Sequence, residues 1–164
     1  KENFGRWGLS EEALQYYKDD SYPLIKLKGI EAQMDKALQK RVWMRSGAYL
    51  VIEPTEALTV IDVNTGKFIK KASDTDETFF QVNAEAAKEC ARQLRLRNIS
   101  GMVMIDFINM KSAEKREALL QILRAETIKD EVQTDVIDYT ALGLVEVTRK
   151  RIDRPLREVL RKEV

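Results

Sequence analysis

Two apolar runs of the sequence each end in an aspartate. Asp62 and Asn64 lie at the end of the run at residues 58–63, and Asp106 lies near the end of the run at residues 102–107. Ligands of open α/β sheets collect at the carboxyl ends of strands, and neighbouring strands lie about 5 Å apart. Two bare carboxylates at that spacing repel each other unless one is protonated or a cation lies between them. The pattern therefore indicates a metal site, although aspartates at strand ends also serve as turn formers and helix caps.

A magnesium ion suits such a pair. Mg²⁺ prefers oxygen ligands, keeps several of its waters, and is often held by one or two carboxylates together with a substrate phosphate. It can neutralise a phosphate and lower the pKa of a bound water, and Mn²⁺ is the alternative ion. We expect Asp62 and Asp106 to be the metal ligands, and Asn64 to orient a carboxylate or the attacking water.

The composition narrows the chemistry further. The 164 residues contain no histidine and one cysteine, Cys90. A Ser-His-Asp triad, a Cys-His pair, a two-histidine ribonuclease mechanism and the usual zinc hydrolase sites are therefore excluded. Hydrolysis by this chain would have to use carboxylates, lysines, tyrosines or an oxygen-bound metal. Cys90 falls on the apolar stripe of a helix and is expected to be a buried packing residue.

Two groups of basic residues are candidates for contact with nucleic acid. The net charge is only +1, but residues 149–162 carry seven lysines and arginines, among them Arg149 and Arg151. Lys67 and Lys70 follow closely after Asn64. Such clusters attract phosphate backbones. The alternatives are a solvated terminal helix for residues 149–162 and a lysine-protected edge strand for the second group.

Aromatic side chains offer a second route to nucleic acid, because bases stack on them. Core packing is the better default for most aromatic residues, so we assign these to the core. The five candidates are Trp7, Trp43, Tyr49, Phe79 and Phe80.

Strands and helices alternate along the chain, which predicts a mixed α/β (α+β) domain with at least one parallel crossover. Residues 10–17 read as a short capped helix, and residues 22–25 as extended. The unbroken apolar run at 102–107 predicts a strand that is buried on both faces. The predicted helices are residues 30–41, a long helix that follows the polar stretch 73–77 and runs to about residue 97, a segment starting at 112, and the C-terminal residues. The predicted strands are residues 49–52, 58–63, 67–71, 102–107, 134–139 and 144–148.

Several long segments of the sequence match one family of enzymes in order and spacing. They are residues 46–67, 83–87, 91–98, 101–110 and 143–151. Over about three quarters of its length, from Gly29 to Arg151, the chain resembles the ribonuclease E/ribonuclease G family.

This resemblance implies a magnesium-dependent endoribonuclease of the cytoplasm that cuts single-stranded, often AU-rich RNA and leaves a 5′-phosphate. It implies a DNase I-like catalytic domain at residues 46–152. Residues 1–45 would be the end of an RNase H-like segment, and residues 153–164 a basic helix. By the family's motifs Asp62 and Asp106 are the metal ligands and Asn64 supports them.

Parts of the family pattern are missing or altered. An S1-type RNA-binding domain and a 5′-end sensor are absent, and the cysteine motif through which many members share zinc between subunits would follow residue 164. We therefore expect a fragment of a longer, homo-oligomeric enzyme without a membrane span. Asn109 replaces an aspartate of the family, and Ala141 replaces a basic residue found in some members. Two alternatives remain: a non-catalytic RNA-binding or assembly module, and a phosphodiesterase that acts on DNA or small phosphoesters.

Overall fold

The computed structural model describes residues 8, 10–66 and 75–160. The chain forms two compact units, residues 1–36 and residues 37–164. The predicted returning strand at residues 67–71 lies outside the described residues.

The first unit contains short helices. No residue of α2 (Leu24–Leu27) or α3 (Ile30–Leu38) is buried. A single turn of 3-10 helix, η1 (Glu11–Ala13), stands where a longer capped helix was predicted. The extended segment predicted at residues 22–25 is wrong in its second half, because α2 (Leu24–Leu27) begins there. Pro23 lacks an N–H and has a fixed φ, so it is well suited to precede a helix, and its carbonyl accepts from Lys26 and Leu27.

The helix predicted over residues 30–41 is shorter than expected. It is α3 (Ile30–Leu38), and the chain then turns into a strand, β1 (Arg41–Trp43). Arg41 was therefore wrongly predicted as helical. It pairs with Val51 of the strand that follows in the sequence, and this pairing overrides its local helical spacing. The sheet thus begins before the boundary expected at residue 46.

As far as the structure describes it, the second unit is built on a six-stranded mixed sheet, in the order β1-β2-β3-β4-β6-β5. β3 and β4 run parallel and the other described pairs run antiparallel. The 22-residue helix α4 connects the two parallel strands, as the predicted crossover requires. The remaining strands are β2 (Tyr49–Pro54), β3 (Thr59–Asn64), β4 (Gly101–Asp106), β5 (Thr134–Tyr139) and β6 (Val145–Arg149).

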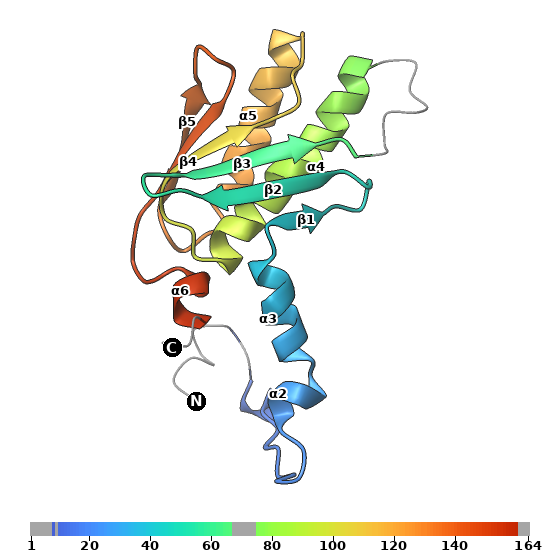
Figure 1. Cartoon of the computed structure of the whole chain (residues 1–164), viewed down its shortest axis with the longest axis vertical. Coiled ribbons are helices and arrows are strands. Elements are labelled where there is room, and N and C mark those ends of the chain that lie inside the picture. The colour runs from blue at the N-terminus through green and yellow to red at the C-terminus, as the bar shows by residue number, and fades with distance from the viewer. Residues whose placement is uncertain (1–7, 9, 67–74, 161–164) are drawn as a thin grey trace. The chain divides into compact units, whose positions relative to one another are not determined.

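Two helices, α4 (Thr75–Leu96) and α5 (Ala113–Thr127), lie on the same side of this sheet (Figure 1). Side chains alternate between the two faces of a strand, and only those facing the helices are fully buried. Ser112 caps the start of α5 by accepting from the Lys115 N–H, which agrees with the helix start predicted at residue 112. Cys90 is fully buried in α4, and burial raises the pKa of its thiol. The core is therefore a sheet packed against one helical layer.

The opposite face of the sheet carries no helix among the described residues. On β4, Val103 and Ile105 are fully buried, whereas Met102 is 53% exposed. The prediction that this strand is buried on both faces is therefore wrong, because helices cover only one face. Asp106 shares the uncovered face with Met102, two pleats further along the strand. We call this surface the open face of the sheet.

The chain's C-terminal part contains one short helix, α6 (Leu156–Leu160). The backbone N–H of Leu156 donates to the carbonyl of Arg97 at the end of α4. No helix in the described part of the chain is both long and apolar enough to cross a membrane. The mixed sheet flanked by helices confirms the predicted α+β fold class.

Candidate active site

The register of the parallel strands places the two predicted carboxylates opposite each other. Asp62 of β3 pairs with Asp106 of β4, so their side chains project from the open face about one strand spacing apart. Asn64, two residues beyond Asp62, shares that face. Its Nδ2 donates a 2.7 Å hydrogen bond to Asp62 Oδ2. Three residues predicted to work together are therefore adjacent at the carboxyl ends of β3 and β4.

Within the described residues, neither carboxylate of the pair forms an ion pair with a lysine or arginine. Partial burial and, second, the neighbouring Asp62 carboxylate raise the pKa of Asp106 above its usual value. A divalent cation bound between the carboxylates would lower the pKa of Asp106 and so oppose both effects. No group of three or more histidine, cysteine, aspartate or glutamate side chains that could hold a metal occurs among the described residues. Two carboxylates and an amide fit Mg²⁺, which keeps several waters, better than an ion that requires a full protein cage.

A shallow hollow of about 370 Å³ surrounds the carboxylates. Polar side chains stand at the strand ends, and apolar ones come from β3, from α4 and from the segment after β4, so a ligand here would meet both kinds of surface. Its lining residues are Asp62, Val63, Asn64, Thr65, Phe79, Asp106, Phe107 and Ile108.

Asn83 of α4 fixes the chain segment that follows Asp106. Its side chain is fully buried; Nδ2 donates to the carbonyl of Ile108 at 2.7 Å, and Oδ1 accepts from the N–H of Ile108 at 2.9 Å. Both backbone groups of Ile108 are thus held by one amide. Asn83 lies four residues before Ala87 on the predicted apolar stripe of the helix. A polar residue on such a stripe needs a partner, and that signal could have revealed its role.

Two acidic residues of α4 anchor further loops beside the site. Asp76 accepts a hydrogen bond from the backbone N–H of Lys111 at 2.8 Å. This hydrogen bond is the main cause that lowers the pKa of the Asp76 carboxyl. Glu85 accepts from the backbone N–H of Arg45 at 2.8 Å. The helix therefore holds both the loop after β4 and the turn between β1 and β2. Sequence reasoning had assigned no such role to Asp76 or Glu85.

The turn after β3 is held by a close backbone approach. Gly66 has φ +59°, and a Cβ placed on it would lie 2.3 Å from the carbonyl oxygen of Gly47. Only glycine fits both the left-handed conformation and this contact. Gly66 therefore fixes the chain two residues beyond Asn64 against the turn between β1 and β2.

The predicted RNA-contacting arginine Arg149 has a different position and role. It is 4% exposed, pairs with Gly101 at the start of β4, and donates to Asp130, Asn98 and the carbonyl of Ile99. The expectation that it contacts RNA is corrected: its guanidinium is buried and its donors are engaged within the chain. Lys67 and Lys70, the other predicted contacts near Asn64, lie outside the described residues.

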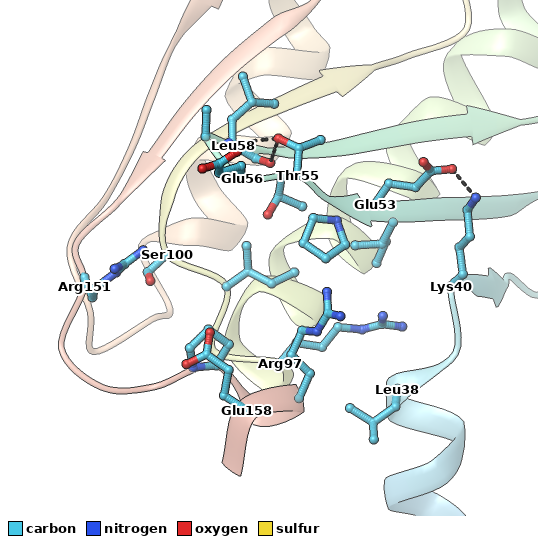
Figure 2. Close-up of a pocket in the computed structure, with 17 residues that line it drawn as sticks. Leu38, Lys40, Glu53, Thr55, Glu56, Leu58, Arg97, Ser100, Arg151 and Glu158 are labelled. Atoms are coloured by element: carbon cyan, nitrogen blue, oxygen red, sulfur yellow. Dashed lines mark hydrogen bonds and ion pairs between the residues drawn. The ribbon is translucent and has the colours of Figure 1, made fainter. Parts of the chain in front are cut away.

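Arg151 is exposed but remote from the carboxylates. It lines a cavity of about 720 Å³ at the starts of β3 and β4, together with Arg97, Glu53 and Glu158 (Figure 2). Figure 2 shows Lys40 paired with Glu53 on the wall of this cavity. Arg97 donates to Gln93 and to the carbonyl of Gln39. The cavity is lined by side chains of both charges, and it lies at the end of the strands opposite Asp62 and Asp106.

The aromatic candidates divide between core and surface. Phe79 and Phe80 are half-buried against the core, as predicted. Trp43 is 62% exposed on the open face, so its assignment to the core is wrong. Three-residue β1 lies at the edge of the described sheet, and no helix from the described residues covers this side chain. Tyr49 is half-buried beside it, and Trp7 lies outside the described residues.

Comparison with known proteins places the chain in a protein family. The sequence profile of the Ribonuclease E/G family matches residues 8–152. Ribonuclease G of Haemophilus influenzae is 44% identical over 152 residues, covering 93% of this chain and 30% of that protein. Ribonuclease G of Escherichia coli K12 is 44% identical over 84% of the chain, and ribonuclease E of Nostoc sp. is 45% identical over the same share. These matches cover 28% and 20% of those two proteins, so the chain spans less than a third of each of these relatives.

Proposed function

Because this chain belongs to the ribonuclease E/G family, we propose that it contains the catalytic core of a metal-dependent endoribonuclease. The observation that carries the proposal is the pairing of Asp62 with Asp106 at the carboxyl ends of two parallel strands. Asn64, hydrogen-bonded to Asp62, completes the site. The names of the relatives support ribonuclease activity, and the acidic pair supports a metal at the centre of it.

Asp62 and Asp106 are the residues that would hold the ion, with Mg²⁺ proposed and Mn²⁺ as a substitute. When bound, such an ion neutralises phosphate charge and lowers the pKa of water. Asn64 keeps the Asp62 carboxylate in one orientation through its Nδ2 hydrogen bond. Asn83 holds the backbone of Ile108, and thereby limits movement of the segment that follows Asp106.

The reaction we propose is hydrolysis of a phosphodiester. Water attacks the phosphorus, and the bond from phosphorus to the 3′ oxygen breaks. The upstream fragment leaves with a 3′ hydroxyl and the downstream fragment keeps a 5′-phosphate. Single-stranded RNA fits the open, shallow hollow at the carboxylates, because an unpaired strand can place one phosphate there without the bulk of a duplex. A preference for AU-rich sequence is part of the same proposal.

The test is cleavage of a 5′-monophosphorylated, AU-rich single-stranded RNA by the 164-residue chain, in Mg²⁺ and in EDTA. We expect cleavage in Mg²⁺ alone, and products with a 5′-phosphate. A DNA strand of the same sequence serves as the comparison substrate. Equal cleavage of RNA and DNA would replace the endoribonuclease by a less selective phosphodiesterase. Cleavage that persists in EDTA would contradict a metal-dependent mechanism.

The second candidate function is a non-catalytic RNA-binding module, which would use the basic residues of the segment 149–162. It predicts salt-sensitive RNA binding without cleavage. The basic cluster on which this idea rested is weakened, since Arg149 is buried. Binding in EDTA combined with no cleavage in Mg²⁺ would favour this candidate over the enzyme.

A further inference from the structure

Three side chains form an exposed cluster on the open face, at the edge of the sheet. They are Arg41, Trp43 and Tyr49, which we call the edge cluster. The rings of Trp43 and Tyr49 lie 4.9 Å apart between centroids, tilted by 54°. The guanidinium carbon of Arg41 lies 4.5 Å from the centre of the Tyr49 ring and 5.8 Å from that of Trp43. Trp43 is 62% exposed, so this arrangement leaves much of a large aromatic surface in contact with water.

The strand register connects the edge cluster to the carboxylates. Trp43 pairs with Tyr49, and Tyr49 pairs with Asn64. Paired residues project from the same face, so Trp43 lies about two strand spacings, or roughly 10 Å, from Asn64. In the neighbouring row, Arg41 pairs with Val51, and Val51 pairs with Asp62. The edge cluster and the carboxylate pair therefore form two parts of one continuous surface.

The edge cluster differs from the carboxylates in its charge and in the groups that it exposes. Asp62 and Asp106 can hold a phosphate only through a bound cation. The edge cluster carries a positive guanidinium and two ring faces. Aromatic faces bind unpaired bases with little regard to sequence, and arginine adds both charge and stacking. A single-stranded nucleic acid could thus place its backbone near Arg41 and a base on the rings.

We propose that the edge cluster is a stacking platform for a base of the single-stranded RNA whose scissile phosphate lies at Asp62 and Asp106. This inference rests on the proposed function and adds a binding site to it. Trp43 supplies the exposed ring, Tyr49 supports it from the neighbouring strand, and Arg41 contacts the backbone of the RNA. The occupant is a nucleobase of an unpaired strand, because a paired base has no free face for stacking.

The experiment uses the full chain and an oligouridylate decamer in EDTA, so that binding is measured without cleavage. A Trp7→Phe background leaves Trp43 as the single tryptophan, since the chain has two. We expect the decamer to quench the fluorescence of Trp43. Trp43→Ala should lose the stacking of one base. Its Kd for the decamer should therefore be about 5- to 100-fold higher than that of the wild type, measured by anisotropy of a labelled decamer. Trp43→Phe, which keeps an aromatic face, should recover most of the affinity.

Met102→Ala is the matched control. Met102 is 53% exposed on the same open face, but it lies at the far end of β4 from Asp106. We expect this variant to bind the decamer as the wild type does. Circular dichroism and thermal unfolding of each variant verify that the fold is retained.

An unchanged Kd in a folded Trp43→Ala variant would overturn the proposal, and so would failure of the wild-type chain to bind the decamer. Loss of self-association on Trp43→Ala, with RNA affinity unchanged, would instead assign the edge cluster to a contact between copies of the chain. Cleavage assays on the same variants separate the two proposals. Trp43-dependent binding without any cleavage in Mg²⁺ would sustain the platform and reject the enzyme. Cleavage in Mg²⁺ that does not depend on Trp43 would sustain the enzyme and reject the platform.

Discussion

Replacement of Asn83 by alanine should weaken both the fold and the site. The substitution removes two hydrogen bonds, of 2.7 and 2.9 Å, that hold the backbone of Ile108. Each such bond contributes about 1 kcal/mol net, and a buried partner left unsatisfied costs about 1–3 kcal/mol. Ile108 is half-buried, so water can partly replace the lost amide. We therefore expect the free energy of unfolding to fall by about 2–4 kcal/mol.

Urea unfolding followed by circular dichroism measures this change. Gln81→Ala is the matched control, because Gln81 is an exposed amide on the same helix, and we expect it to stay within about 0.5 kcal/mol of the wild type. Displacement of a reactive group by about 1 Å can reduce a rate about 100-fold, so RNA cleavage by Asn83→Ala should fall by about 10- to 100-fold. An Asn83→Ala variant as stable as Gln81→Ala would refute the anchoring role that we assign to Asn83.

Asp130→Asn should cost about 3 kcal/mol of unfolding free energy at neutral pH, because it leaves the buried Arg149 guanidinium without its anion. Burial raises the pKa of Asp130, but hydrogen bonds, chiefly from Arg149, outweigh it and leave the pKa below its usual value. This carboxylate therefore stabilises the fold above about pH 3.9, and its contribution is lost as the pH falls through the lowered pKa. Urea unfolding from pH 7 to pH 3 should show a shallower acid loss in the variant than in the wild type. Gly66→Ala should lower the melting temperature more than Gly143→Ala, since both have positive φ but only a Cβ at position 66 would meet the Gly47 carbonyl. Equal losses in the two glycine variants would contradict the importance of that contact.

Local sequence predicted the strands and the acidic pair well. The apolar runs that end at Asp62 and Asp106 became adjacent parallel strands, because a helix of more than 20 residues joins them. The polar capping residue Ser112 likewise identified the start of α5. In each of these cases the signal lies within a few residues of the feature it predicts.

Features that depend on distant pairing were not visible in the sequence. Nothing local distinguishes Arg149, buried against Asp130, from the exposed Arg151 two residues later. Strand β1 has three residues and is defined by its pairing with β2, so a helical pattern was a reasonable but wrong prediction there. Trp43 was assigned to the core because large aromatics are usually buried. Its exposure follows from its position on an edge strand and an uncovered face.

The most direct measurement for this account is the kcat/KM for RNA cleavage by Asp106→Asn compared with Asp135→Asn, both in Mg²⁺. Asp135 is an exposed carboxylate of β5 that pairs with Thr148, and it lies two strands from Asp106 on the same sheet. We expect Asp135→Asn to cleave as the wild type does. Asp106→Asn should lose at least about 1000-fold, since a bound metal contributes several kcal/mol to the transition state and each 1.4 kcal/mol is a factor of ten. Cleavage by Asp106→Asn at the rate of the control would contradict the paired-carboxylate site.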